Sequence, residues 1–305
     1  FPPERVSVAA GGAEVAGAFA ALPFDHLVFT GSTAVGRKVM AAAAPNLTPL
    51  TLELGGKSPA IVCDDFPVDQ AAARLATGKW FNGGQTCIAP DYVLLVGRQR
   101  RDALVQALRD QVAARYGDLS EAGDFTRIIN DSQFARLEGY LDDARQRGHE
   151  VVPLAPKHDR AQRLFAPTVV IEPGDDAKVM QDEIFGPILP IRTVDSLDQA
   201  IAYVNAHDRP LALYPFSNDR ARVEKILGTT LAGGVTVNDT VLHFGINALP
   251  FGGIGPSGMG AYHGRAGFDA MSKALPVLWQ PRRAGSDLLK PPYSKVARFI
   301  DFIIR

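Results

Sequence analysis

The feature that most constrains the fold is a regular alternation of strand and helix patterns. HLVFTG (26–31) is typical of a strand and is followed by the helical pattern STAVGRKVMAAAA (32–44). The same order returns near the end of the chain, where ILPIRTV (188–194) and LALYPFS (211–217) alternate with helical patterns. Strands that alternate with helices form parallel sheets covered on both faces. The sequence therefore predicts an α/β fold built from two such units.

Three local patterns give further expectations. VSVAAG (6–11) predicts a strand, and Pro215 within LALYPFS predicts an edge strand or a bulge, because proline cannot donate to a neighbouring strand. Apolar residues at helical spacing in 294–304 predict an amphipathic helix. That helix is too short to cross a membrane, and packing on the protein's own surface or a subunit is favoured over association with a membrane surface.

Charge and cysteine content restrict the class of partner. The net charge is -1 with a pI near 6.7, which offers no basic field for nucleic acid, so a small molecule is the expected partner. Two cysteines exclude a disulfide scaffold and favour a reducing cytoplasm. No apolar run reaches the ~20 residues of a membrane span. The six histidines show no metal-ligand spacing, and we expect no metal.

Two glycine-containing segments imitate a phosphate loop and fail on detail. In GSTAVGRK (31–38) an arginine follows the second glycine, and in GGKS (55–58) the leading glycine is missing and the chain continues as a strand. Hydrolysis of a nucleoside triphosphate is therefore disfavoured. The turn at Gly31 and Ser32 still directs backbone N–H groups of a helix start toward an anion, as dinucleotide sites do.

Cys87 has the setting of a nucleophile. In FNGGQTCIAPDY (81–92) it follows two glycines and two small polar residues, which allow close approach and supply hydrogen bonds. Cys63 ends the apolar run SPAIVC and is expected to be a buried structural thiol. A free thiol is mostly protonated at neutral pH, so reactivity at Cys87 requires nearby dipoles or cations.

Two glutamates stand out in apolar surroundings. Glu53 lies within the strand pattern LTLEL, and Glu183 lies in DEIFGP. A buried carboxylate is unfavourable unless it is paired, protonated or used in chemistry. The alternative, that Glu53 occupies the exposed face of its strand, is left open by the pattern alone.

Five ordered motifs, FTGSTAVG, LELGGKSP, FNGGQTCIAPDY, EIFGP and LPFGGIGPSGMGAYHG, together resemble the aldehyde dehydrogenase superfamily. They are most similar to its class 3 branch, which includes coniferyl aldehyde dehydrogenases. The resemblance implies an incomplete Rossmann-like sheet that binds NAD or NADP in 1–63, and an α/β catalytic domain in 64–243. It also implies that residues 244–305 contain a glycine-rich segment that returns to the first domain, an oligomerisation segment and a C-terminal tail helix. Homodimers or homotetramers, and an aromatic or medium- to long-chain aldehyde substrate, are implied as well.

The resemblance also implies roles for individual residues. Cys87 would attack the aldehyde, and Glu53 would activate the water that releases the acid. The expected cofactor contacts are Gly31, Ser32, Val35, Leu54, Gly55, Glu183 and Phe185, with Glu183 on the nicotinamide ribose. Thr86 and Phe251 would line the substrate end. The presence of Glu53 favours hydrolytic oxidation over branches that transfer the acyl group to coenzyme A or phosphate.

Family motifs that supply an oxyanion-hole asparagine and ribose contacts do not occur in this sequence. We therefore expect the chain to lack an N-terminal part of the family's length, and to be weakly active by itself. Two alternatives stay open. A cysteine hydrolase would use Cys87 with a histidine and need no nicotinamide, and a non-catalytic fragment would only fold and self-associate.

Overall fold

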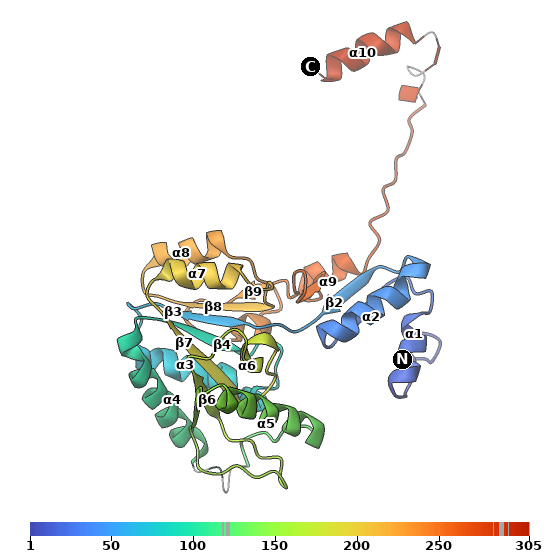
Figure 1. Ribbon diagram of the computed structural model, residues 1–305. Coiled ribbons are helices and arrows are strands. Elements are labelled where there is room, and N and C mark those ends of the chain that lie inside the picture. The colour runs from blue at the N-terminus through green and yellow to red at the C-terminus, as the bar shows by residue number, and fades with distance from the viewer. Residues whose placement is uncertain (118, 120–122, 283, 287–289, 292, 305) are drawn as a thin grey trace. The chain divides into compact units, whose positions relative to one another are not determined.

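The structure is a computed structural model that describes residues 1–117, 119, 123–282, 284–286, 290–291 and 293–304. The chain divides into two compact units, Phe1–Met271 and Ser272–Arg305. The first unit holds two sheets with helices packed against them (Figure 1), which confirms the predicted α/β class.

In the described residues, the larger sheet has seven strands in the order β5-β6-β7-β4-β3-β8-β9. They are β3 (Pro59–Val62), β4 (Tyr92–Val96), β5 (Glu150–Pro153), β6 (Thr168–Ile171), β7 (Ile188–Val194), β8 (Ala212–Phe216) and β9 (Gly234–Val235). Neighbouring strands are parallel except for β5 and β6. Burial on both faces explains why β3, β6 and β8 are almost wholly apolar.

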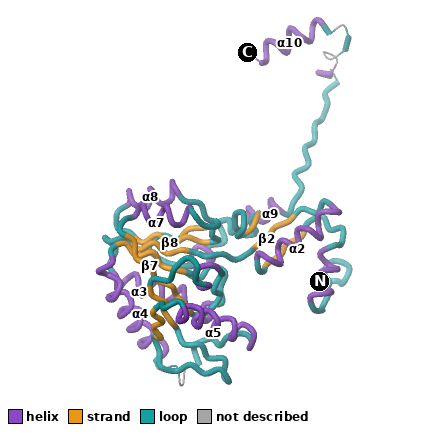
Figure 2. Tube along the Cα trace, in the orientation of Figure 1, coloured by secondary structure: helices purple, strands orange, loops and turns teal. Residues whose placement is uncertain are grey.

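Helices cover both faces of the larger sheet (Figure 2). They are α3 (Val68–Trp80), α4 (Arg101–Tyr116), α5 (Asp131–Gln146), α6 (Lys178–Gln181), α7 (Leu197–Asn205) and α8 (Arg220–Thr229). α3 and α4 share one core with Ala60 and Val62 of β3, whereas α5, α7 and α8 share the other with Ile61. Alternate residues of a strand point to opposite faces, so one short strand anchors both layers.

In the part of the chain that is described, the smaller sheet has three strands in the order β1-β2-β10. β1 (Leu27–Thr30) is parallel to β2 (Leu50–Glu53), and β10 (Gly258–Met259) is antiparallel to β2. The helices α1 (Ala13–Ala20) and α2 (Thr33–Ala43) accompany this sheet. The chain passes from the smaller sheet to the larger one between β2 and β3.

Short helices complete the fold: η1 (Ala44–Asn46), η2 (Phe81–Gly84), η3 (Arg98–Arg100), η4 (Leu242–Gly245) and α9 (Gly264–Ala270). The second unit contains α10 (Ser294–Ile304), which confirms the predicted tail helix. None of the described helices combines the length and the apolar character needed to cross a membrane.

Two local predictions are wrong. Residues 6–11 form no strand, because Val6 and Val8 are exposed and this segment pairs with no described strand that could accept its backbone hydrogen bonds. Pro215 lies at neither an edge nor a bulge, since it pairs in register with Ile61 while β8 runs between β3 and β9. Its carbonyl accepts from Asn238 beyond the end of the two-residue β9, so the missing donor faces the side where regular pairing has ended.

β3 lies inside the segment 1–63 that was assigned to cofactor binding, yet it belongs to the larger sheet. The two sheets therefore divide at the loop of residues 54–58. The functional division into 1–63, 64–243 and 244–305 stays a prediction.

Candidate active site

Glu53 ends β2 at the crossing between the two sheets. Its backbone is held on both sides, by Thr30 of β1 and Gly258 of β10. The side chain is 4% exposed, and neither carboxylate oxygen has a hydrogen-bond partner among the described residues. Burial therefore raises the pKa of Glu53 to about 8. The side chain occupies the buried face of its strand, which removes the alternative of a solvent-exposed carboxylate.

Cys87 lies on the loop between η2 and β4. The side chain of Gln85 fixes this loop, since its Nε2 donates to the carbonyl of Arg127 at 3.1 Å and its Oε1 accepts from the N–H of Ile129 at 2.9 Å. The Cys87 thiol is partly exposed and packs against the apolar core. Cys63 is fully buried, which confirms its predicted structural setting.

Gly84 allows a second loop to lie directly against the Cys87 loop. Its φ is +75°, and a Cβ at this position would overlap the carbonyl oxygen of Gly186. The close approach to the backbone that the glycines allow is thus made by another loop of the same chain. It brings the loop that carries Glu183 and Phe185 next to Cys87.

The pKa of the Cys87 thiol is raised, so the nearby backbone dipoles do not supply the activation that its reactivity requires. Burial is the main cause, followed by the negative charge of Glu183 and, more weakly, that of Glu53; the resulting pKa is about 11. Backbone N–H groups of Cys87 and Ile88 act in the other direction without overcoming these effects. The thiol is therefore protonated at neutral pH, and it has two carboxylates as electrostatic neighbours.

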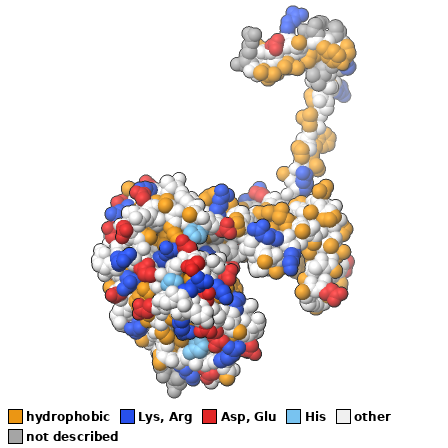
Figure 3. Space-filling view, viewed as in Figure 1, with side chains coloured by type: hydrophobic (Ala, Val, Ile, Leu, Met, Phe, Trp, Pro, Cys, Tyr) orange, Lys and Arg blue, Asp and Glu red, His pale blue; other side chains and the backbone are white. Residues whose placement is uncertain are grey.

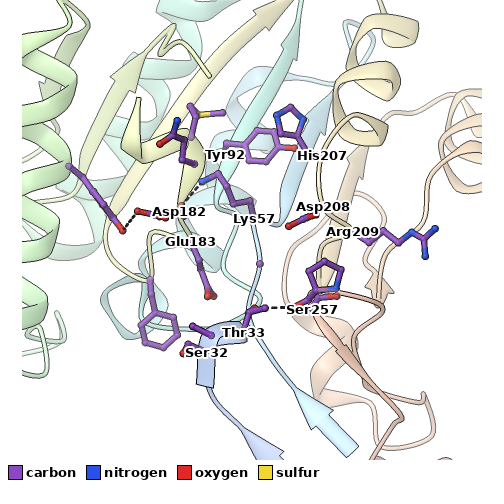
Figure 4. A pocket seen from close by; sticks show the side chains of 18 of the residues that line it. Ser32, Thr33, Lys57, Tyr92, Asp182, Glu183, His207, Asp208, Arg209 and Ser257 are labelled. Atoms are coloured by element: carbon purple, nitrogen blue, oxygen red, sulfur yellow. Dashed lines mark hydrogen bonds between the residues drawn. The ribbon is translucent and has the colours of Figure 1, made fainter. Parts of the chain in front are cut away.

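A cleft of about 840 Å³ lies beside these loops. Of the predicted cofactor-binding residues, Ser32, Gly55, Glu183 and Phe185 line it. Figure 4 shows the carboxylate of Glu183 pointing toward Ser32 and Thr33, at the turn that begins α2. The hydroxyl of Ser32 caps α2 by accepting from the N–H of Val35 at 3.4 Å. The structure thus brings a helix start, a bare glycine backbone and a carboxylate to one cleft.

Glu183 is held over this backbone by several groups. Burial and the charge of Asp91 raise its pKa to about 7, while the N–H of Gly56 and the cations Lys57 and Arg136 oppose the rise. A Cβ at Gly55 would overlap the Glu183 carboxylate. The glycine is therefore required for this carboxylate to lie against the backbone.

Gly55→Ala tests that contact. We expect the added methyl group to displace the Glu183 carboxylate and to weaken binding of NAD(P)H by about tenfold, while the free energy of unfolding changes by less than about 1 kcal/mol. Titration of cofactor fluorescence measures the first quantity, and denaturant unfolding measures the second.

Gly139→Ala is the matched control, because a Cβ at Gly139 meets no atom within 4 Å. Unchanged cofactor affinity in Gly55→Ala would show that the position of the Glu183 carboxylate does not govern binding.

Three other predicted cofactor contacts lie outside the lining of the cleft. Gly31 donates its N–H to the carbonyl of Glu53 at 3.0 Å and so belongs to the strand end. Leu54 is buried against α2. The side chain of Val35 is 45% exposed. Figure 3 shows that hydrophobic and charged side chains are interspersed on the visible face of the first unit. Their roles stay predictions.

The two predicted substrate contacts differ in exposure. Thr86 is partly exposed beside Cys87. Phe251 is 4% exposed, and its ring packs in an aromatic cluster that consists of His243, Phe244, Phe251, Tyr262 and His263. Phe251 belongs to the same core against which Cys87 packs.

Sequence reasoning missed three charged residues that hold this site together. Lys57 lies in the motif LELGGKSP and Asp91 lies in IAPDY, but no role follows from either motif for these two side chains. Their ion pair has an N···O distance of 2.5 Å. Arg136 of α5 donates to the carbonyls of Glu183 and Ile184 at 3.3 and 2.8 Å. The available signal for Asp91 in the sequence was an aspartate placed directly after the apolar residues of IAPDY, where a charged side chain is uncommon.

The described residues contain no group of three or more His, Cys, Asp or Glu side chains arranged to hold a metal ion.

Comparison with known proteins gives a consistent family. The sequence profile of the "Aldehyde dehydrogenase family" matches residues 1–275. A probable coniferyl aldehyde dehydrogenase of Pseudomonas aeruginosa is 51% identical over 295 residues, which cover 97% of this chain and 61% of that protein. A dimeric NADP-preferring aldehyde dehydrogenase of Rattus norvegicus is 46% identical, with coverage of 82% and 54%.

A solved structure shows the same likeness. The substrate-bound state of Staphylococcus aureus AldH superposes with a TM-score of 0.90 at 38% identity, and the match covers 97% of this chain and 64% of that one. The chain thus spans less than two thirds of the length of these relatives. The profile match over most of its residues shows that the chain belongs to the aldehyde dehydrogenase family.

Proposed function

We propose that this chain carries the nucleophile, the base and the nicotinamide-ribose contact of an NAD- or NADP-dependent aldehyde dehydrogenase. The observation that carries the proposal is the grouping of Cys87, Glu53 and Glu183. They come from three separate segments, and both carboxylates act on the pKa of the thiol. Perturbed titratable groups gathered beside a cleft are typical of catalytic sites.

The residues that line the cleft fit a dinucleotide. The start of α2 at Ser32 offers backbone N–H groups to phosphate, and the bare backbone at Gly55 allows close approach. Glu183 offers a carboxylate to ribose hydroxyls, and Phe185 presents a ring that is 40% exposed. Bound NAD(P) would supply the hydride acceptor.

The reaction would proceed through a covalent acyl group on the chain. The sulfur of Cys87 adds to the aldehyde carbon as the thiol proton passes to solvent water. Loss of hydride from that carbon gives an acyl thioester on Cys87. Backbone N–H groups beside Cys87 would share in holding the oxyanion. Water then attacks the thioester carbon while Glu53 accepts the water proton. Glu53 passes this proton to the departing sulfur, so the carboxylic acid leaves and the thiol re-forms.

The environment of Glu53 suits the role of base. With a pKa of about 8, it is a stronger base than an exposed glutamate, and its two oxygens have no described hydrogen-bond partner to compete with water. The base form grows as the pH rises through 8. Turnover limited by thioester hydrolysis should therefore increase over the same range.

The relatives guide the finer assignments. Coniferyl aldehyde dehydrogenases among them support an aromatic aldehyde substrate, and a relative described as dimeric and NADP-preferring supports a homodimer. A cytoplasmic location rests on the cysteine content alone. A hydrolase that uses Cys87 with a histidine gains no support, because the groups that shift the pKa of Cys87 are carboxylates and backbone N–H groups.

Selective alkylation tests the assignment of the nucleophile. One equivalent of iodoacetamide should label Cys87 before Cys63, because Cys63 is fully buried while Cys87 is partly exposed. Peptide mass mapping, read together with residual dehydrogenase activity, measures the order. If Cys63 were labelled first and activity were lost with it, the assignment of Cys87 as the nucleophile would be wrong.

A further inference from the structure

Two buried charges and one partly buried charge that the proposed reaction does not use lie against the cleft. Asp91 is 2% exposed, Lys79 of α3 is fully buried, and the side chain of Lys57 is 17% exposed. We call these three residues the charge cluster. Burying charged groups is unfavourable unless they are paired, so an arrangement of this kind calls for an explanation.

Asp91 is the centre of the charge cluster. Its Oδ2 lies 2.5 Å from the ammonium of Lys57, and its Oδ1 accepts from the N–H of Ile184 at 3.1 Å. The Oδ1 also lies 3.9 Å from the ammonium of Lys79, which has no hydrogen-bond partner among the described residues. One carboxylate therefore faces two cations and one backbone donor.

Lys57 extends these contacts to the loop that carries Glu183. Its ammonium donates to the carbonyls of Val179 and Asp182 at 2.8 and 2.9 Å, in addition to Asp91. Figure 4 shows the bond from Lys57 toward this loop, while Glu183 points away from it into the cleft. Contacts at 179, 182 and 184 thus fix the loop on both sides of Glu183.

We propose that Asp91 is a positioning residue that, together with Lys57 and Lys79, holds the Glu183 loop in place and sets the charge on Glu183. The proposal rests on the function proposed for Glu183 as the nicotinamide-ribose contact. An ionised carboxylate can accept hydrogen bonds from two ribose hydroxyls, whereas a protonated one has a donor in place of an acceptor. The charge cluster would therefore determine the pH range in which cofactor binds.

The charged groups around Glu183 come from several elements and act in opposite directions. The charged ones are Asp91 before β4, Lys57 before β3, Lys79 of α3 and Arg136 of α5, and the Cys87 thiol is a titratable neighbour that is neutral at neutral pH. Asp91 raises the pKa of Glu183, and Lys57 and Arg136 lower it. The balance leaves the pKa at about 7, where a change of one neighbour alters the charge at neutral pH.

Opposite shifts in two variants separate this role from a purely structural one. Asp91→Asn removes a negative neighbour and should lower the pKa of Glu183 by about one pH unit, while Lys57→Met removes a positive neighbour and should raise it by a similar amount. Loosening of the loop alone would move both variants in the same direction. The double variant should have a pKa near that of the wild type.

The readout is the titration of the Glu183 carboxyl by NMR of protein labelled with ¹³C at the glutamate side-chain carboxyl. The Glu183 signal is assigned as the one that is absent in Glu183→Gln. The measurement requires no cofactor. Lys225→Met is the control, since Lys225 pairs with Asp198 on the surface. Shifts of opposite sign support the proposal, and equal or absent shifts overturn it. If Asp91→Asn fails to fold, Lys57→Met is compared with the double variant, which removes both members of the ion pair: a rise in Lys57→Met that the second substitution reverses supports the proposal, and a rise that persists overturns it.

Cofactor binding forms the second arm of the experiment. The dissociation constant of NADH is measured against pH by fluorescence, and the pH below which affinity falls should move down in Asp91→Asn and up in Lys57→Met. Failure of the wild-type protein to bind NADH or NADPH at any pH would refute the proposed function of Glu183. The NMR titration would still decide whether the charge cluster controls its ionisation.

Discussion

Replacement of Glu53 by glutamine is expected to give a burst of reduced cofactor that approaches one equivalent per site and is followed by very slow turnover. Glutamine keeps the shape of the side chain but cannot take a proton from water, so acylation of Cys87 survives while hydrolysis stalls. We expect steady turnover to fall by about 10²- to 10⁴-fold. Stopped-flow absorbance measures the burst, and intact mass should find the acyl group on Cys87.

Glu224→Gln is the matched control, because Glu224 is an exposed carboxylate paired with Arg220. Its burst and turnover should equal those of the wild type. Loss of the burst in Glu53→Gln would place Glu53 before hydride transfer, where it would take the proton from the thiol. Its role as the base for hydrolysis would then be withdrawn.

Cys87→Ser should lower turnover by a factor of about 10³ or more and abolish the burst. A serine hydroxyl is scarcely ionised at neutral pH, and the burial and negative charges that act at this position disfavour ionisation further. Cofactor binding should remain within about twofold of the wild type, because Cys87 does not line the cleft. The burst amplitude and the NADH dissociation constant are the two measurements.

Cys63→Ala provides the comparison. Cys63 is fully buried in the apolar core, so its replacement should lower the free energy of unfolding by about 1 kcal/mol and leave the burst intact. A burst that persists in Cys87→Ser but is lost in Cys63→Ala would exchange the roles of the two thiols.

The sequence predicted the layers of the fold because periodicity reports which side of an element is buried. ILPIRTV and LALYPFS lie in β7 and β8, as their patterns indicate. The strand predicted for VSVAAG is absent because a strand also needs a neighbouring strand to bond its backbone groups, and a local pattern carries no information about that neighbour. The edge strand or bulge predicted at Pro215 was wrong for a related reason, since only the length of β9 shows where pairing on that side of β8 ends.

The candidate site was predictable in its residues and not in its electrostatics. Glycines and small polar residues singled out Cys87, and an apolar context singled out Glu53. The raised pKa of the thiol could not be predicted, because burial and the approach of Glu183 beside the contact between Gly84 and Gly186 are set by the fold and not by a local motif. The ion pair of Lys57 with Asp91 likewise joins residues that are distant in sequence and adjacent only in the fold.

The unpartnered carboxylate of Glu53 also bears on how variants of this protein would be selected. The pKa of Glu53 is 4.5 in an exposed reference state and about 8 in the fold. The folded state therefore holds this proton more tightly, and the free energy of unfolding falls as the pH rises between these two values. Substitution by an uncharged side chain should therefore raise the melting temperature at pH 8. A search for thermostable variants that scored folding alone would enrich replacements of Glu53 and remove the base that we propose for thioester hydrolysis, so such a search has to hold this position fixed.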